Sequence, residues 1–337
     1  MKKYLITISV LLALSLLGTC ISAAFAMGDL GVSVSQGVSA LGETIKDLCR
    51  AADEEGFPSR WDWEGYWDNW EAAGSAFEYY EDRQALPGPV TGLDLTNSLG
   101  EMTVQPSGTE ESYYVLSCRA RRGYVPAVSS SLQDGVLRLR LDKDRVNPLH
   151  YMKKLRIDLY LSQSTLESLS VVCSAGTFQA SGLSFRQVEA RVSAGEVDLS
   201  AAGFADTVKL LVSAGDLEYL GDAAALDAEV STGDLDFEGK VSESCKVSVS
   251  AGSAELSLLS LPQNTSLFCT AGDISLEIPS DDGFTILQKS SSLSDCSFDF
   301  DLAKAVRDGK TSYTYLNGGK EISVSASAGS IEIQPGD

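Results

Sequence analysis

Histidine is almost absent from this sequence, and basic residues are scarce. The 337 residues include one histidine, His150, and 26 lysines and arginines against 47 aspartates and glutamates, so the formal net charge is −21. A single histidine excludes every metal site built from two imidazoles and argues against histidine-based catalytic triads. The excess of acidic residues excludes a surface that grips a phosphate backbone, so no nucleic acid is expected as a partner.

Closely spaced cysteine pairs are also missing. The seven cysteines are odd in number, and no two of them form a Cys-x-x-Cys pair. Zinc sites and thiol–disulfide enzymes rely on such pairs, so the sequence predicts neither a metal site nor a cofactor. No unique cluster of aspartate, arginine or lysine interrupts the repeat described below, as a catalytic site would. We therefore assign no catalytic residue.

Residues 1–28 are predicted to form a hydrophobic helix that acts as a membrane anchor or an export signal. Lys2 and Lys3 precede an uncharged run that ends at Ala26. At ~1.5 Å per residue, this run is long enough to cross the ~30 Å hydrocarbon layer. Two alternatives stay open: a retained anchor with the lysines inside, which we favour, or a signal cleaved after Ala26. Both place the rest of the chain outside the cytoplasm.

Residues 29–90 are predicted to form an acidic, tryptophan-rich segment beside the membrane. Residues 51–82 hold ten acids and one base, together with all four tryptophans, Trp61, Trp63, Trp67 and Trp70. Their spacing predicts a short helix with the indoles on one side. This helix would either dock to a partner or the membrane interface, or cap the domain that follows; the cap is favoured. Pro87-Gly88-Pro89 marks the boundary.

From residue 165 onward, one short motif returns six times, typified by Val-Ser-Ala-Gly-Asp-Leu at 212–217. Its glycines are residues 176, 195, 215, 233, 252 and 272, at intervals of 19, 20, 18, 19 and 20 residues. Apolar residues alternate with polar ones on both sides of each glycine, which is typical of strands with one buried side. The sequence therefore predicts an all-β fold: a β-solenoid over residues 91–337, whose coils of ~19 residues hold two short strands each.

The repeated glycine marks the corner between the two strands of a coil. Either the corner needs a backbone conformation that a side chain forbids, or adjacent coils approach too closely for a Cβ atom. Cys173 and Cys269 both lie three residues before such a glycine, five coils apart, so ~24 Å would separate them and a disulfide is excluded. Cys245 and Cys296 also fall at inward positions, and we expect them to pack as small hydrophobic side chains.

Partial copies of the motif occur at 97–104, 291–298 and 326–333. Alternating apolar residues also predict strands at 137–141 and 155–161, which lead directly into the first regular coil. Because a solenoid needs caps at its ends, we expect the irregular stretch 301–320 to form one.

The stretch 119–156 is basic, with ten bases and three acids. Two interpretations stay open. The bases could contact an anionic wall polymer or an acidic partner, or they could pair with acidic residues of the chain itself, which is favoured.

Acidic residues follow each corner glycine at the solvent-facing positions one and three residues later. Successive coils would place them ~4.8 Å apart in two columns ~6.6 Å apart, so like charges crowd one face. Such a face could bind Ca²⁺ or a cationic peptide, or could serve only as a soluble face that blocks sheet aggregation, which is favoured. The candidate ligand-binding residues are Glu196, Asp198, Asp216, Glu218, Asp234, Asp236, Glu255 and Asp273.

The Val-Ser-Ala-Gly-Asp-Leu-Glu elements, the preceding Leu-Arg-Ile-Asp-Leu-Tyr-Leu (155–161) and the hydrophobic N-terminus resemble a bacterial family of β-strand-repeat proteins named "putative adhesin". The resemblance covers roughly residues 91–337. It implies a membrane-anchored or secreted β-solenoid that faces the surface, often linked to cell-envelope stress. The family is of unknown function, so the resemblance carries no catalytic residue, and residues 51–82 have no counterpart in it.

We therefore expect a non-enzymatic, extracytoplasmic protein that binds or scaffolds along its face, with a cell-envelope component or a cationic ligand as partner. The expected membrane contact is the N-terminal helix, or none if the signal is cleaved. The alternative is a polysaccharide-processing β-helix enzyme, which would need paired carboxylates outside the repeat.

Overall fold

The computed structural model describes residues 77–124, 128–141, 152–288, 295–307 and 310–336. The predicted anchor 1–28 and most of the predicted acidic segment 29–90, with its four tryptophans, lie outside these ranges. Residues 77–337 belong to one compact unit. Every regular element described is a strand, and no helix long and apolar enough to span a membrane occurs among them.

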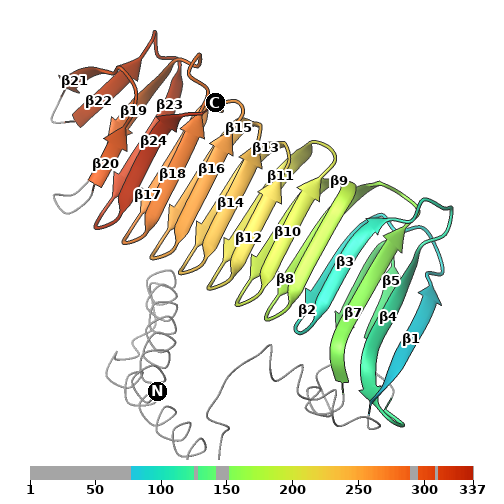
Figure 1. Cartoon of the computed structure of the whole chain (residues 1–337). Coiled ribbons are helices and arrows are strands. Elements are labelled where there is room, and N and C mark those ends of the chain that lie inside the picture. Colours follow the sequence, from blue (N-terminus) through green and yellow to red (C-terminus); the bar gives the residue numbers. More distant parts are fainter. Residues whose placement is uncertain (1–76, 125–127, 142–151, 289–294, 308–309, 337) are drawn as a thin grey trace, which may run out of the picture. The chain divides into compact units, whose positions relative to one another are not determined.

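The strands form two sheets that face each other (Figure 1). In spatial order, sheet A contains β1 (Phe77–Ala85), β4 (Tyr113–Arg121), β7 (Met152–Leu161), β3 (Glu101–Pro106), the first part of β9 (Thr177–Val192), β10 (Glu196–Ala201), β12 (Asp216–Leu220), β14 (Asp234–Gly239), β16 (Ser253–Leu258), β18 (Asp273–Ile278), β24 (Ser330–Pro335) and β20 (Asp295–Phe298). Sheet B contains β5 (Val128–Gln133), β6 (Val136–Leu141), β2 (Gly92–Asn97), β8 (Thr165–Cys173), the second part of β9, β11 (Ala205–Val212), β13 (Ala223–Val230), β15 (Val241–Val249), β17 (Asn264–Cys269), β23 (Lys320–Ala326), β19 (Phe284–Gln288), β22 (Lys310–Tyr315) and β21 (Ala303–Arg307).

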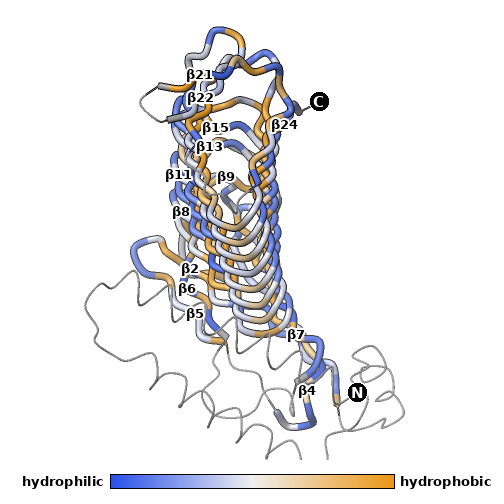
Figure 2. Tube along the Cα trace, turned by 90° about the vertical axis from the view of Figure 1, so that its left-hand side faces the viewer, coloured by the Kyte–Doolittle hydropathy of each residue, from blue (hydrophilic) through white to orange (hydrophobic). Residues whose placement is uncertain are grey.

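Each coil contributes one parallel strand to each sheet, and successive coils appear as nested loops in the end view (Figure 2). The predicted alternation is confirmed, because the inward residues of both strands are buried throughout the regular coils. In the coil of β11 and β12, for example, Val208, Leu210 and Val212 face Leu217 and Tyr219 across the core. Each coil covers its neighbour's apolar surface, so the solenoid is stabilised by contacts between coils that are near in sequence.

The corner glycines are required by close approach of the backbone. A Cβ atom built on any of residues 176, 195, 215, 233, 252, 272 and 329 would lie 2.1–2.3 Å from the carbonyl oxygen of the corner glycine in the adjacent coil. None of these seven glycines has a positive φ. The structure therefore selects the second of the two explanations drawn from the sequence: adjacent coils leave no room for a side chain at this point.

Hydrogen bonds continue around the corner without interruption. In one typical coil, the amide of Ser213 donates to the carbonyl of Val192 (2.8 Å), that of Ala214 to Ser193 (2.9 Å) and that of Asp216 to Gly195 (3.0 Å). The same pattern recurs in the neighbouring coils. Backbone groups at the corner are thus satisfied by the next coil, as buried backbone requires.

The coils do not stack in sequence order at the two ends. β2 and β3, joined at Gly100, lie between β6–β7 and β8–β9. β23 and β24 lie between β17–β18 and β19–β20. The partial copies at 97–104 and 326–333, and the described residues 295–298 of the copy at 291–298, are therefore confirmed as coil positions. The predicted strands at 137–141 and 155–161 are confirmed as well. Along the chain β7 leads into β8, but in space β2–β3 lies between these strands and the first regular coil. The coil of β2 and β3 has the same inward apolar residues and a glycine at its corner, as the regular coils do. It therefore fits between the coil of β6–β7 and the coil of β8–β9.

Antiparallel strands close both ends. β1 and β4 extend sheet A and β5 extends sheet B at one end. β22 and β21 extend sheet B at the other, so the predicted cap over 301–320 consists largely of these two strands.

The described cysteines behave as core residues. Cys118, Cys173, Cys245 and Cys269 are buried thiols outside any disulfide. The thiols of Cys173 and Cys269 donate to the carbonyl oxygens of Gly176 (3.0 Å) and Gly272 (2.9 Å) at their own corners. Cys296 pairs in register with the buried Ile331 and is half-buried, as its predicted inward position requires.

Replacement of a corner glycine by alanine should destabilise the domain strongly. In Gly233→Ala, the new methyl group would meet the Gly215 carbonyl oxygen at 2.1 Å and Val212 Cγ1 at 2.7 Å. We expect a loss of at least about 2 kcal/mol in the free energy of unfolding, measured by denaturant titration. Gly88→Ala is the matched control, because its nearest contact would be Leu132 at 3.6 Å, and it should change stability by less than about 0.5 kcal/mol. Equal effects of the two changes would contradict the close-approach explanation.

Candidate functional site

The structure places all eight predicted acidic side chains on the outer surface of sheet A, between β10 and β18. Two columns form by strand register. Glu196, Asp216 and Asp234 are neighbours in the first, which continues through Ser253 to Asp273. The second column runs without interruption through Asp198, Glu218, Asp236 and Glu255. We call this surface the acidic face.

Three further carboxylates that the sequence patterns missed belong to the same surface. Glu238 and Glu277 occupy the position five residues after the corner glycine, and Glu332 extends the second column onto β24. The fifth position is the next outward position of the same strand, so extending the alternation by two residues would have found the first two. Glu332 is the third residue after Gly329, so the same rule applied to the late copy would have found it, and only its place beside β18 required the structure.

Polar side chains donate hydrogen bonds to some carboxylates of the acidic face. Gln179 Nε2 donates to Asp198 (2.9 Å), Ser253 Oγ donates to Asp234 (2.5 Å) and Gln334 Nε2 donates to Glu277 (2.9 Å). Within the described part of the chain, none of the face's carboxylates forms an ion pair with a lysine or arginine. Glu218, Asp236 and Glu255 therefore form the uncompensated centre.

Asp236 shows the electrostatic effect of this crowding. Partial burial raises the pKa of its carboxyl above the ordinary value, and the charges of Asp234 and Asp216 raise it further. Both causes disfavour the ionised form. A positive charge placed over this position would relieve the repulsion.

The outer surface of sheet B carries bases among its acids, and several of them form ion pairs. Arg191 pairs with Glu189 (2.6 Å), and Lys246 pairs with Asp227 across adjacent coils (3.1 Å). Arg186 lies 3.6 Å from Glu167 and 3.4 Å from Asp206. Sheet B therefore carries ion pairs along the regular coils, whereas the outer surface of sheet A from β10 to β18 carries carboxylates without bases.

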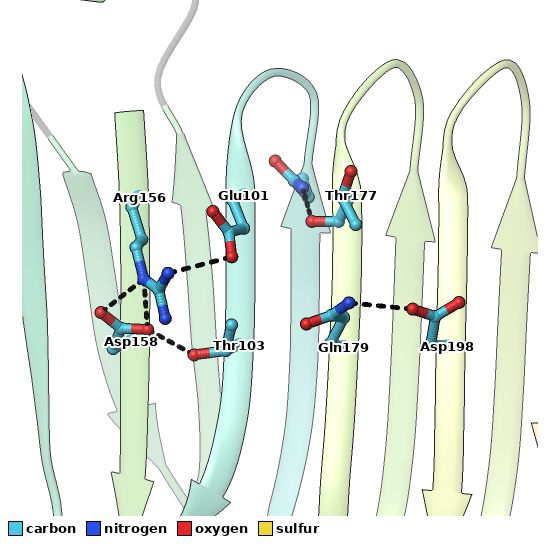
Figure 3. A network of polar contacts seen from close by, with 8 residues as sticks. Glu101, Thr103, Arg156, Asp158, Thr177, Gln179 and Asp198 are labelled. Atoms are coloured by element: carbon cyan, nitrogen blue, oxygen red, sulfur yellow. Dashed lines mark hydrogen bonds and ion pairs between the residues drawn. The ribbon is translucent and has the colours of Figure 1, made fainter. Parts of the chain in front are cut away.

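Three bases of the basic stretch form ion pairs within the N-terminal coils, and Figure 3 shows those of Arg156. Arg156 binds Glu101 (3.1 Å) and Asp158 (2.8 Å), and Asp158 also accepts a hydrogen bond from Thr103. Arg138 and Arg140 share Asp94, at 3.3 and 3.6 Å. Pairing of these bases with the chain's own acids, which the sequence favoured, is confirmed for them. Glu101 and Asp94 lie on strands next to those of the bases, whereas Asp158 lies on the same strand as Arg156. The acidic face begins beyond Gln179.

Comparison with protein families decides the affiliation of the chain. The model of the family described as Toastrack DUF4097 matches residues 93–334. The chain belongs to this Toastrack family. The resemblance drawn from the sequence is thereby confirmed at the level of a family of unknown function, and the all-β, solenoid-like architecture is typical of it.

Solved structures with a similar fold include two named "putative adhesin". One, from Bacteroides fragilis NCTC 9343, is 13% identical with a TM-score of 0.48, covering 77% of this chain and 97% of that one. The other, from Parabacteroides distasonis ATCC 8503, is 12% identical with a TM-score of 0.48, covering 76% and 97%. A "putative lipid binding protein" from the same strain is 13% identical with a TM-score of 0.47, covering 77% and 98%. No curated protein matches.

The described part of the Toastrack domain contains no group of three or more histidine, cysteine or acidic side chains arranged to hold a metal ion. Its acidic face is a flat lattice of carboxylates, whereas Ca²⁺ takes six to eight converging oxygen ligands. A pocket between coils is lined by apolar side chains and Ser200, with no carboxylate. Tyr219 also lines this pocket; its hydroxyl is buried without a hydrogen-bond partner among the described residues, and burial raises its pKa. The geometry suits an extended cationic ligand better than a chelated ion.

Removing one central charge of the acidic face should not destabilise the Toastrack domain at neutral pH. Folding raises the pKa of Asp236, so the protonated carboxyl favours the folded state. This contribution to the free energy of unfolding is complete below the ordinary pKa of 3.8 and is lost as the pH rises through the raised pKa. We expect Asp236→Asn to equal or exceed wild type in free energy of unfolding at pH 7, by up to about 1 kcal/mol, and the difference to vanish in acid.

The matched control for this measurement is Asp227→Asn on sheet B, which breaks the ion pair with Lys246. It should lose up to about 1 kcal/mol at pH 7. Denaturant titrations across the acid range test both variants. A clear destabilisation of Asp236→Asn at neutral pH would show that its charge is compensated.

Proposed function

We propose that this protein is a non-enzymatic, extracytoplasmic surface protein whose acidic face binds a cationic partner. The observation that carries the proposal is the contrast between the two faces. On sheet B, Glu189 and Asp227 form ion pairs with Arg191 and Lys246, whereas sheet A presents Glu218, Asp236 and Glu255 in consecutive coils, and none of these three forms an ion pair among the described residues. Like charges held ~5 Å apart by a rigid backbone favour binding of positive charge.

The repeat distance defines the kind of partner. Carboxylates recur with the ~4.8 Å spacing of paired strands along the solenoid and ~6.6 Å along each strand. An extended peptide with closely spaced lysines or arginines can place several charges over such a lattice at once. This is why we favour a cationic peptide or an envelope component with exposed amines over a single metal ion.

The surface location rests on the predicted N-terminal segment and on the family. Residues 1–28 are predicted to anchor the chain or to direct its export, and the similar structures from Bacteroides fragilis and Parabacteroides distasonis bear names that refer to adhesion or lipid binding. The acidic face would repel an anionic lipid surface. We therefore expect its partner to be an envelope component other than the anionic lipid headgroups. The mass of the mature protein tests the anchor: loss of residues 1–26 would exclude it.

The alternative of a polysaccharide-processing enzyme requires carboxylates that leave the repeat register and flank a cleft. The carboxylates of the acidic face all occupy repeat positions. Serine takes the same positions in other coils, as Ser253 does beside Asp234. Interchangeable positions suit a binding surface, and we therefore favour binding over catalysis.

A charge-neutral triple variant tests the binding face. The variant Glu218→Gln, Asp236→Asn, Glu255→Gln should bind a lysine-rich peptide about tenfold or more weakly than the wild-type chain, measured by calorimetry at low salt. The matched control carries the same charge change on sheet B: Glu189→Gln, Asp227→Asn, Glu229→Gln. Its affinity should stay close to that of wild type.

Calcium titration is the second arm of this experiment. Heat with Ca²⁺ that disappears in the same triple variant would replace the peptide by a divalent cation as ligand. Heat from neither ligand, at micromolar peptide and millimolar calcium, would refute the binding function of the acidic face.

A further inference from the structure

The C-terminal coil, formed by β23 and β24, lies between two coils that follow each other in sequence. β23 and β24 separate β17–β18 from β19–β20, although the latter pair follows β18 directly in sequence. The amides of Glu321, Ser327 and Ser330 donate to one neighbouring coil, at Gln263, Cys269 and Gly272 (each 3.0 Å). On the other side, Asp295 and Asp299 donate to Gly329 (3.2 Å) and Ile333 (2.9 Å). The inserted coil is therefore bonded along both edges.

The core contacts of this coil are as complete as those of any regular coil. Ile322, Val324, Ile331 and Ile333 are each at most 1% exposed. The space between β17–β18 and β19–β20, which residues 320–335 fill in a defined register, is called the slot below.

The turn that leads into the coil has a strained backbone. Residues 316–319 cross over the start of β19, where a Cβ atom on Gly283 would meet the Gly318 carbonyl oxygen at 2.6 Å. Gly318 and Gly319 have φ values of +69° and +118°, and the non-glycine Leu316 has φ +51°. The Leu316 side chain is 58% exposed, so packing does not compensate for its left-handed conformation.

We propose that this slot is an interaction site for a second copy of the same chain, which inserts its own residues 320–335 by strand exchange. An exchanged dimer keeps every contact of the coil, including the ion pair of Lys320 with Asp282 (2.6 Å), so the two states differ mainly in the hinge. Opening the turn releases the left-handed conformation of Leu316. A short, strained hinge favours exchange over the closed monomer.

The exchange would join two copies at the end of the solenoid opposite β1. It leaves the acidic face from β10 to β18 uncovered, since the slot lies beyond β18. The proposal therefore stands apart from the function of the acidic face, and either can fail without the other.

A register-specific disulfide tests the exchange. Cys269 and Ala326 are partners on adjacent strands and both side chains are buried, so Ala326→Cys should form a disulfide with Cys269 inside one chain. Full-length chain carrying both Ala326→Cys and Cys269→Ser is then refolded together with an equal amount of wild-type chain. In this mixture the introduced thiol can reach Cys269 only in another copy.

We expect a covalent dimer that contains this disulfide, identified by mass spectrometry of the joined peptides, and a dimer fraction that rises with protein concentration during refolding. Deleting Gly318 and Gly319 should increase the fraction several-fold. Inserting Gly-Ser after Gly319 should decrease it several-fold.

The proposal is overturned if the single variant forms its internal disulfide while the mixture yields no such dimer at any concentration. Equal dimer fractions for the wild-type and the lengthened hinge would also overturn it. This comparison tests the proposal even if the variant with the shortened hinge does not fold.

Discussion

The close approach of adjacent coils at the corner glycines is the constraint on which the rest of the structure depends. At Gly215 the backbone of one coil lies so near the next that a Cβ atom would be 2.1 Å from the Gly195 carbonyl oxygen. The amides on either side of the glycine can then reach the carbonyls of the neighbouring coil. Both sheets are thereby held in one register along the solenoid, because the corner joins them coil by coil.

That register determines what the surface can do. Residues one and three positions after the corner must face outward on sheet A, so Asp216 and Glu218 lie beside Asp234 and Asp236 whatever their charges prefer. On sheet B the same rigidity places Lys246 beside Asp227, where it forms an ion pair. A backbone that cannot relax holds repulsion on one face and attraction on the other, and this asymmetry is the physical basis of the proposed binding surface.

The sequence predicted the regular coils because each short strand carries the same local signal. Glycines at intervals of 18–20 residues, with alternating apolar residues around them, specify the coil, its inward side chains and the positions of the eight candidate carboxylates. The early and late copies around Gly100 and Gly329 were found for the same reason. Strand β1 was not, since residues 77–85 lie within a stretch whose acids and tryptophans dominate its pattern.

The order of the coils at the two ends could not be predicted, because every coil offers its neighbour the same register and the same apolar surface. Nothing local distinguishes β8 from β6 as a neighbour of β2; only the length of the connections and the completed core decide. The hydrogen bonds to carboxylates of the acidic face could not be predicted from the sequence either. Gln179 and Ser253 become hydrogen-bond donors to Asp198 and Asp234 only when adjacent coils align, and their roles depend on pairing across about twenty residues of sequence.

The acidic face of sheet A, and not the charge of the chain as a whole, is proposed to recognise positive charge. A residue-resolved NMR titration of the full chain with a lysine-rich peptide separates the two possibilities. We expect carboxyl and amide shifts to concentrate on Glu218, Asp236, Glu255 and their neighbours from β10 to β18, while Glu189, Asp227 and Glu229 on sheet B stay unchanged. Shifts of equal size on both sheets would contradict it, because they would show binding driven by net charge alone.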